Sequence, residues 1–434
     1  MNILWVKMGG LWPCTSGGRL RSLHTIASMA TRHKVTVVTT HGPADDPDGL
    51  RHRLSDCHDV ISIPYAAPKR GTAAFALSLA RSWMSPDPVE LWKWRVRAVS
   101  DRVRAIIDSG GVDVCIADFL LAAPNVPLGG HVPVVLFEHN VEYLIWKRLA
   151  EIESSPLRRA LFEIEWRKLR RSEAEACRRA DLTIAVSEDD RQRLAELAPG
   201  SRTAAVVTGV DTNYFVQNGF KQRPSQMVFC GSMDWHPNED AVLYFADSIL
   251  PRIRAEIPDA ALTVVGRNPS ARIRELAARC PGIQVTGTVE DVRPSVGEAS
   301  VYVVPLRAGG GTRLKILEAL SMSKAVVSTT VGAEGLALES GRHFVAADEP
   351  GHFAAEVVDL LRNHERRTRL GREGRYLVET HNSWDTVARD FERHCAALVG
   401  AEAEDTDPDL EPAVVGRAFT PRHSSGQAAR QGAA

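Results

Sequence analysis

The sequence lacks the apolar run that a membrane-spanning helix needs. Such a helix takes about 20 consecutive, mostly apolar residues, and no stretch of the 434 residues approaches that length. The chain opens on a strand-like segment, MNILWVKM, without the basic and apolar regions of a signal peptide. We therefore expect a cytoplasmic protein whose contact with a membrane, where there is any, is peripheral and on the inner face.

The sequence also lacks the cysteine pairs of a metal site or a disulfide framework. Its seven cysteines are scattered, without a CxxC and without histidines at metal-ligand spacing. The chain is nearly neutral, with 53 Lys and Arg against 54 Asp and Glu and a formal net charge of −1. We expect reduced thiols, no bound metal and no nucleic acid partner, since nucleic acid binding needs a basic surface.

A dinucleotide fingerprint is missing as well. The loop after the first predicted strand reads GGLWPCTSGGRLRSLHTI and contains no GxGxxG, and the second strand ends at His41 without an acidic residue. This argues against a Rossmann-type NAD site. Gly17 and Gly18 precede an amphipathic helix, which fits a ligand-binding turn at a helix N-terminus and a plain structural turn equally well.

The sequence does contain a regular alternation of short apolar strands with helical stretches. This pattern is typical of parallel sheets built from βαβ units. We expect an α/β protein with two doubly wound, Rossmann-like domains that face a central cleft, since 434 residues exceed one ordinary core. The predicted strands are residues 2–7, 34–39, 60–64, 112–117, 132–137, 182–186, 204–207, 226–231, 261–266, 283–287, 301–306, 325–329 and 343–346.

Changes in composition predict the domain boundaries. An N-terminal domain (1–212) is followed by a polar linker (213–226) and a C-terminal domain (227–382). Residues 383–400 carry apolar residues at helical spacing, which predicts a helix. Residues 401–434 have little to bury and are predicted to be disordered.

The most informative segment is VPLRAGGGTRLKILEALSMSKAVVSTTVGAEGL, residues 304–336. It predicts a buried strand, a glycine turn, a helix that begins at Thr312 and a second buried strand. Gly309, Gly310 and Gly311 leave no side chains between the backbone and an incoming ligand. A flexible turn is the alternative, but a turn at the carboxyl end of a parallel strand lies where such sheets bind ligands.

Charged residues in this predicted helix indicate what the ligand is. Arg313 and Lys315 lie in the first turn, where the helix dipole disfavours cations, so an anion is expected to meet them. Glu318 shares a helix face with Lys315 and could accept ribose hydroxyls. A nucleotide-diphosphate site is the prediction, with a solvated helix face as the alternative.

His139 directly follows the apolar strand VPVVLF, between Glu138 and Asn140. It is therefore expected at the carboxyl edge of the first sheet, where ligands bind. A core histidine held by a neighbour explains the same pattern, and both interpretations stay open.

Two segments combine aromatic with basic residues, WMSPDPVELWKWRVRAVSDRVR from Trp83 and YLIWKRLAEIESSPLRRALFEIEWRKLRRSEAEACRR from Tyr143. Amphipathic helices of this kind suit an anionic membrane surface. Helices that pack their aromatic side chains into their own domain would look the same.

Four stretches together carry a family resemblance: WPCTSGGRLRSLHTIASMATRHKVTVVT, FEHNVEYLIWKR, GSMDWHPNEDAVLYF and PLRAGGGTRLKILEALSMSKAVVST. In combination they resemble the retaining, nucleotide-sugar-dependent glycosyltransferases of family 4, which have the GT-B fold. The resemblance covers roughly residues 1–398 and is strongest with a bacterial branch linked to exopolysaccharide synthesis.

The resemblance implies roles for individual residues. His139 matches the family's active-site histidine near the transferred sugar, and Gly17 and Gly18 match the glycine loop that faces the diphosphate. Glu318 matches the second Glu of the Glu-x7-Glu motif, which holds the ribose. The resemblance also implies that the last helix crosses back to brace the first domain.

The sequence departs from the family pattern in three places. The first Glu of Glu-x7-Glu falls on Gly310, so its contact with the donor sugar is missing. Ser232 and residues 235–238 stand where the family has an Arg and a Lys. The family's Asn-Gly-Val-Asp motif is replaced in this chain by Thr-Gly-Val-Asp, which begins at Thr208. Arg313 and Lys315 could supply the cationic function instead, stabilising the leaving phosphate without a metal.

These observations predict a metal-independent, retaining hexosyltransferase without a cofactor. It would transfer a sugar from a nucleotide-diphospho-sugar to a saccharide, lipid-linked or small-molecule hydroxyl, in bacterial polysaccharide or glycoconjugate biosynthesis. His139, Arg313 and Lys315 are the predicted catalytic residues. The alternatives are a nucleotide-binding scaffold that has lost transfer, a nucleotide-sugar 2-epimerase and, least favoured, an NAD-dependent oxidoreductase.

Overall fold

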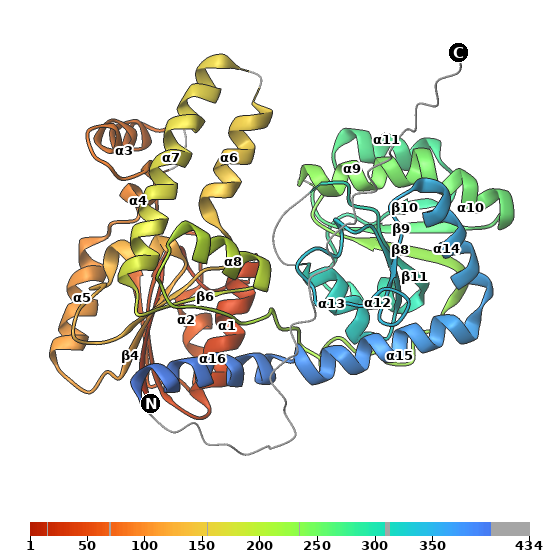
Figure 1. Ribbon diagram of the computed structural model, residues 1–434. Helices are drawn as coiled ribbons and strands as arrows, with labels where there is room; N and C mark the ends of the chain where they lie inside the picture. The colour runs from red at the N-terminus through yellow and green to blue at the C-terminus, as the bar shows by residue number, and fades with distance from the viewer. Residues whose placement is uncertain (15, 69–70, 154, 234, 309–312, 401–434) are drawn as a thin grey trace, which may run out of the picture. The chain divides into compact units, whose positions relative to one another are not determined.

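The computed structural model describes residues 1–400 apart from 15, 69–70, 154, 234 and 309–312. The tail predicted to be disordered, 401–434, lies outside these residues. The chain forms two compact units, each with its own parallel sheet (Figure 1). The first unit contains Met1–Val216, helix α13 (Leu314–Ser321) and the chain from Arg375 to the end of α16. The second contains residues 217–309 and Ser323–Gly374.

The first unit is built on a seven-stranded parallel sheet in the order β3-β2-β1-β4-β5-β6-β7. All seven strands predicted in the first half of the chain are present, with ends that differ by one or two residues. Its elements are β1 (Asn2–Lys7), α1 (Gly17–Ala30), β2 (Lys34–His41), α2 (Pro47–Arg53), β3 (Asp59–Pro64), α3 (Ala73–Trp83), α4 (Val89–Lys93), α5 (Arg97–Asp108), β4 (Val114–Asp118), η1 (Leu120–Asn125), β5 (Val134–Phe137), α6 (Glu142–Ile152), α7 (Pro156–Arg179), β6 (Leu182–Ala185), α8 (Glu188–Leu197), β7 (Thr203–Ala205) and, after the second sheet, α16 (Trp384–Val399).

The second unit is built on a six-stranded parallel sheet in the order β10-β9-β8-β11-β12-β13. Strand β8 begins at Arg223, inside the segment predicted as a linker, because its first residues are polar and give no apolar signal. The elements are β8 (Arg223–Cys230), α9 (His236–Tyr244), η2 (Phe245–Ile249), α10 (Leu250–Glu256), β9 (Ala261–Val265), α11 (Ala271–Arg279), β10 (Ile283–Val285), α12 (Arg293–Glu298), β11 (Ala299–Val304), β12 (Ala325–Ser328), β13 (Val345–Ala346), α14 (Pro350–Arg362) and α15 (His364–His381). The predicted α/β fold with two doubly wound sheets is confirmed.

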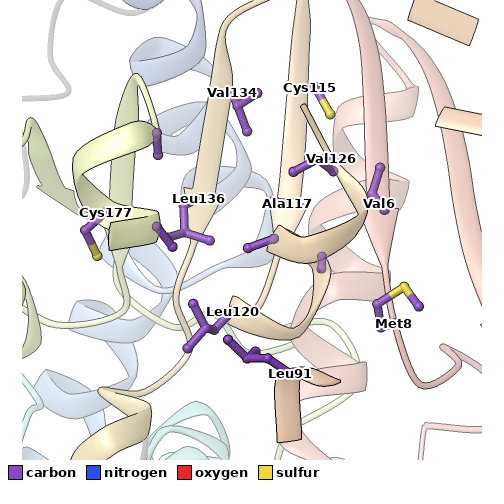
Figure 2. Packing of buried hydrophobic residues seen from close by; sticks show 14 of the residues in the cluster. Val6, Met8, Leu91, Cys115, Ala117, Leu120, Val126, Val134, Leu136 and Cys177 are labelled. Atoms are coloured by element: carbon purple, nitrogen blue, oxygen red, sulfur yellow. The ribbon is translucent and has the colours of Figure 1, made fainter. Parts of the chain in front are cut away.

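The core of the first unit follows the two-residue period of its strands. Leu4 and Val6 of β1 belong to a buried cluster on one face of the sheet, which Figure 2 shows from close by. Ile3 and Trp5, the alternate residues, belong to a second cluster on the other face. Both faces are buried because helices cover both, and this is why each strand is a continuous apolar run in the sequence.

The helix expected from residue 383 is α16, and Ser383 caps it by accepting a hydrogen bond from the N–H of Thr386 (3.1 Å). Its apolar side chains pack in the core of the first unit. The ring of Phe391 lies 5.6 Å from the ring of Trp5 and 4.9 Å from that of Phe137, measured between centroids. Helix α16, the last in the part of the chain that the structure describes, therefore contributes to the core that contains β1 and β5.

We expect Phe391→Ala to lower the unfolding free energy of the first unit by about 3–5 kcal/mol, because it leaves a cavity between two buried aromatic rings. Urea denaturation followed by circular dichroism measures this loss. Arg389→Ala, on the exposed side of the same helix, is the matched control and should change stability by less than about 0.5 kcal/mol. Equal effects of the two variants would show that α16 does not contribute to this core.

Candidate active site

Three buried polar side chains meet at the carboxyl edge of the first sheet. Lys7 ends β1, Asp118 ends β4, and His139 lies two residues beyond β5. The Lys7 Nζ is 3.3 Å and the His139 Nε2 is 3.0 Å from the same oxygen, Oδ1 of Asp118. The indole N–H of Trp5 donates to the other oxygen, Oδ2, at 2.8 Å. Strand order places β1 and β5 on either side of β4, so Asp118 is the centre of the cluster.

Burial and charge determine the protonation states of this cluster. Burial alone would raise the pKa of Asp118, but the Lys7 ammonium and His139 bring it well below its usual range, so the carboxylate is ionised. Burial lowers the pKa of His139 to about 3, against the opposing effect of Asp118, so the imidazole is neutral at physiological pH. The ionised carboxylate beside Nε2 favours the proton on that nitrogen. Nδ1 is then a hydrogen-bond acceptor.

The ring of His139 is held between two phenylalanines. It stacks on Phe119 with 3.8 Å between centroids, and the ring of Phe137 lies at 4.4 Å. Among the described residues, the buried Nδ1 has no hydrogen-bond partner, and the contact of Nε2 is the 3.0 Å approach to Asp118, whose geometry is not that of a hydrogen bond. A buried polar atom of this kind calls for an explanation, and a ligand hydroxyl would supply the missing partner.

The close approach of α1 to this ring explains one of the two predicted glycines. Gly17 and Gly18 are the first residues of α1, which is capped by Ser16. A Cβ on Gly18 would lie 2.7 Å from Cζ of Phe119 and 3.6 Å from Nδ1 of His139. A side chain at position 18 would therefore clash with Phe119 and contact Nδ1, and glycine avoids both. The structure thus brings Gly18 and His139 together, as the interpretation of a ligand-binding turn requires.

A second group of buried acidic residues includes Glu138, which directly precedes His139 in the sequence, and Glu173. The carboxylate of Glu173 caps α6 by accepting hydrogen bonds from the N–H groups of Glu142 (2.7 Å) and Tyr143 (3.0 Å). Burial raises the pKa of Glu173 to about 8. Burial, and next the charge of Glu173, raise the pKa of Glu138 well above its usual range. The pair therefore retains a proton near neutral pH.

The predicted donor-site residues are only partly within the described chain. Gly309, Gly310, Gly311 and Thr312 lie outside it. The prediction that the helix begins at Thr312 is wrong, because α13 begins at Leu314 and residue 313 occupies the N-cap position. Sequence favoured Thr312 because its hydroxyl is a good cap, whereas the observed cap position carries no side-chain cap hydrogen bond.

The other three predicted residues lie on α13 or at its start. Arg313 is buried, whereas Lys315 and Glu318 are partly buried. Burial raises the pKa of Glu318 to about 7, and the positive charge of Lys315 limits this rise. A carboxyl group that is partly protonated near neutral pH can both donate to and accept from ligand hydroxyls. The alternative interpretation of the sequence, a helix face exposed to solvent, does not fit this burial.

Sequence reasoning missed Lys7, Asp118 and the acid pair Glu138 and Glu173. Lys7 and Asp118 are charged residues that end apolar strands, in WVKM and CIADF, and this signal could have marked both. Nothing in the sequence indicates that Glu173, in the middle of a charged helix, is buried.

Comparison with protein families identifies the class of this protein. The model described as "Glycosyltransferase Family 4" matches residues 17–214, and the model described as "Glycosyl transferases group 1" matches residues 224–363. The two matches follow one another along the chain and include strands of both sheets, and β1 precedes the first match. This chain is a family-4-like glycosyltransferase of the GT-B fold.

Sequence relatives of this glycosyltransferase are moderately similar. The phosphatidyl-myo-inositol mannosyltransferase of Mycobacterium tuberculosis is 28% identical over 234 residues, which is 51% of this chain and 61% of that protein. The match thus spans less than two thirds of that relative. A 44.6 kDa protein in the cps region of Klebsiella pneumoniae is 20% identical over 83% of this chain and 91% of its own length.

Solved structures share the fold of this glycosyltransferase over nearly its whole length. A glycosyltransferase from Rickettsia africae superposes with a TM-score of 0.62 at 14% identity, covering 92% of this chain and 99% of that one. Anabaena Alr3699/HepE, solved in complex with UDP and glucose, gives a TM-score of 0.60 at 14% identity over 92% and 100%. At these identities the likeness shows the fold.

The described residues also lack a membrane-spanning helix and a metal-binding cluster. None of their helices has the length and apolar character that crossing a bilayer requires. No cluster of three or more His, Cys, Asp or Glu side chains among them is arranged as a metal site.

The glycosyltransferase should lose stability as pH rises through the range in which the acid pair ionises. The folded pKa values are raised, so this contribution is complete below about pH 4.5 and is lost as pH rises through about 8. We expect Glu138→Gln to reduce the loss of unfolding free energy between pH 5 and 8.5 by on the order of 2 kcal/mol, measured by urea denaturation. Glu151→Gln, an exposed control on α6, should leave the pH profile unchanged. A wild-type profile that rises over this range would contradict the assignment.

Proposed function

We propose that this glycosyltransferase transfers a hexose from a nucleotide-diphospho-sugar to a hydroxyl group with retention at the anomeric carbon. The observation that carries the proposal is the neutral imidazole of His139. Its Nε2 lies against the ionised Asp118, and its Nδ1 lacks a partner beside Gly18. A hydroxyl of the transferred sugar would complete the hydrogen bonding of Nδ1, which fixes the orientation of the anomeric carbon.

The donor diphosphate is proposed to bind at α13. In this proposal Arg313 and Lys315 supply positive charge to the phosphates, and Glu318 binds ribose hydroxyls. In the reaction the bond between C1 of the sugar and the phosphate oxygen breaks, and a bond between C1 and the acceptor oxygen forms. The acceptor's proton passes to the departing phosphate, so His139 orients the sugar and need not act as a base. Fixed cations can stabilise the leaving group, and no metal ion is part of the proposal.

The acceptor is proposed to be a saccharide, lipid-linked or small-molecule hydroxyl in bacterial polysaccharide or glycoconjugate biosynthesis. Two of the relatives support this choice. One is named for transfer of mannose to phosphatidyl-myo-inositol and the other for its place in a cps region. Both names describe those proteins, and here they favour a carbohydrate pathway without identifying the sugar.

Donor binding is tested by thermal stabilisation with UDP, GDP, ADP and dTDP. We expect one of them to stabilise the wild type, by about 2.7 kcal/mol at a ligand concentration of 100 times Kd, because it binds only the folded state. Lys315→Ala and Glu318→Ala should each reduce the shift. Arg279→Ala, an exposed cation on α11, is the control and should retain it. Stabilisation that survives both α13 variants would place the donor site elsewhere.

The role of the histidine is tested by turnover. We expect His139→Ala to lower donor-dependent product formation by at least about 100-fold, because the hydrogen bond that orients the sugar is lost. Stabilisation by the nucleoside diphosphate should persist in this variant, since α13 is unchanged. Asp118→Asn should lower kcat with little change in KM for the donor, because the imidazole loses the charge that fixes its proton. Unchanged turnover in a folded His139→Ala variant would refute the assignment.

A further inference from the structure

Helix α3 has an exposed apolar surface that the fold of the first unit does not explain. Eight of the eleven residues of this helix, AAFALSLARSW, are apolar. The one fully buried residue of the helix is polar, Ser82. Trp83 is 53% exposed, and Met84, which follows the helix, is 83% exposed. Phe75 and Leu79 are half-buried, and the other six apolar side chains of the helix are exposed to solvent. Exposed apolar surface of this kind marks an interaction site.

The neighbouring helices extend this surface. Helices α6 and α7 run side by side and project past the end of the first sheet, with α3 next to α7 (Figure 1). Lys168 of α7 donates a hydrogen bond to the carbonyl oxygen of Ser82 at 2.8 Å, which fixes α3 against α7. Leu157, at the start of α7, is 74% exposed, and Ile164, about two turns farther along, is also exposed. We call α3, α6 and the part of α7 up to Arg171 the projecting helices.

The aromatic side chains of the two segments that begin at Trp83 and Tyr143 fall into two groups, those that pack within the protein and those that are exposed. Trp146 packs edge to face against Phe162, with 5.8 Å between centroids, and Trp94 packs against Tyr65 at 5.6 Å. These rings belong to the protein's own packing, as one sequence interpretation held. That packing does not account for Trp83, Met84 and Leu157, which remain exposed.

The charge around the exposed apolar residues is strongly positive. Among the described residues of the projecting helices, Glu151 is the one fully exposed acidic side chain, and Glu163 is partly exposed and forms an ion pair with Arg167. The exposed basic side chains are Arg81, Lys147, Arg148, Arg158, Arg159, Arg167, Arg170 and Arg171. The apolar residues therefore lie within a basic surface, which suits a partner that is negatively charged outside and apolar beneath.

We propose that the projecting helices dock on a lipid bilayer that contains anionic phospholipids. Trp83, Met84 and Leu157 would enter the boundary between headgroups and acyl chains, while the arginines contact the phosphates. A second copy of this chain is a poorer occupant, because a symmetric contact would set the basic surface against itself. The proposal does not depend on sugar transfer, since it concerns helices outside the His139 cluster.

The proposal is tested with purified full-length protein and sedimented vesicles that contain neither sugar donor nor acceptor. We expect binding to phosphatidylcholine vesicles with about 30% phosphatidylglycerol to be at least about 10-fold tighter than to pure phosphatidylcholine. About 0.5 M NaCl should reverse most of this preference, because salt screens the arginine–phosphate attraction. Failure to bind the anionic vesicles would overturn the proposal and would leave the proposed function untouched.

Two sets of variants locate the contact. Leu77→Ser, Trp83→Ser and Met84→Ser combined should weaken binding by about 10-fold or more, whereas Tyr376→Ser, an equally exposed aromatic on α15, should not. Arg158→Glu with Arg159→Glu should abolish the preference for anionic vesicles. Arg369→Glu with Arg372→Glu, two exposed arginines of α15, is the charge-matched control.

The same variants distinguish a lipid surface from self-association. All replaced residues are exposed, so the melting temperature should not change, and sedimentation velocity without vesicles should give the same species for wild type and variants. A wild-type oligomer that dissociates in the serine triple variant would overturn the proposal in favour of a contact between copies. Vesicle binding that is equal in wild type and both sets of variants would also overturn it.

Discussion

One buried negative charge organises the edge of the first sheet. Asp118 is removed from water completely, and an isolated carboxylate in that position would cost several kcal/mol. It remains ionised because two segments supply three partners: β1 supplies the indole N–H of Trp5 and the ammonium of Lys7, and the segment after β5 supplies the imidazole of His139. The charge is thus stable only when β1, β4 and the segment after β5 are in register. Correct pairing of these strands therefore also brings the side chains of the His139 cluster together.

The same charge accounts for the unusual features around it. The Lys7 ammonium, drawn to Asp118, lies 3.5 Å from the centroid of the Phe119 ring, a cation–π contact. Phe119 has a φ of +71°, rare for a bulky residue, and this conformation accompanies the stacking of its ring on His139. The ring in turn leaves no room for a side chain at Gly18. The glycine follows from the position of an aromatic ring, which sequence spacing does not reveal.

Sequence reasoning found what depends on local pattern and missed what depends on strand order. β1 was predicted with its observed ends, because both faces of the sheet are buried and the strand is a continuous apolar run. Asp118 and His139 are 21 positions apart (139 − 118) and meet only because β4 and β5 are adjacent in the sheet. Nothing local encodes that adjacency. The helix start was predicted at Thr312 from local cap preference alone, whereas the observed N-cap residue is the buried Arg313, which makes no side-chain cap hydrogen bond.

One departure from the pattern of the resembled family lies in the second unit. Ser232 stands there where that family has a charged residue. In this structure Arg267, which follows β9, donates to the hydroxyl of Ser232 at 2.7 Å. A cation thus lies beside the substituted position, supplied by the neighbouring strand rather than by the loop itself. A neighbouring strand can supply charge to a ligand-binding edge in this way, because parallel strands end at one common edge.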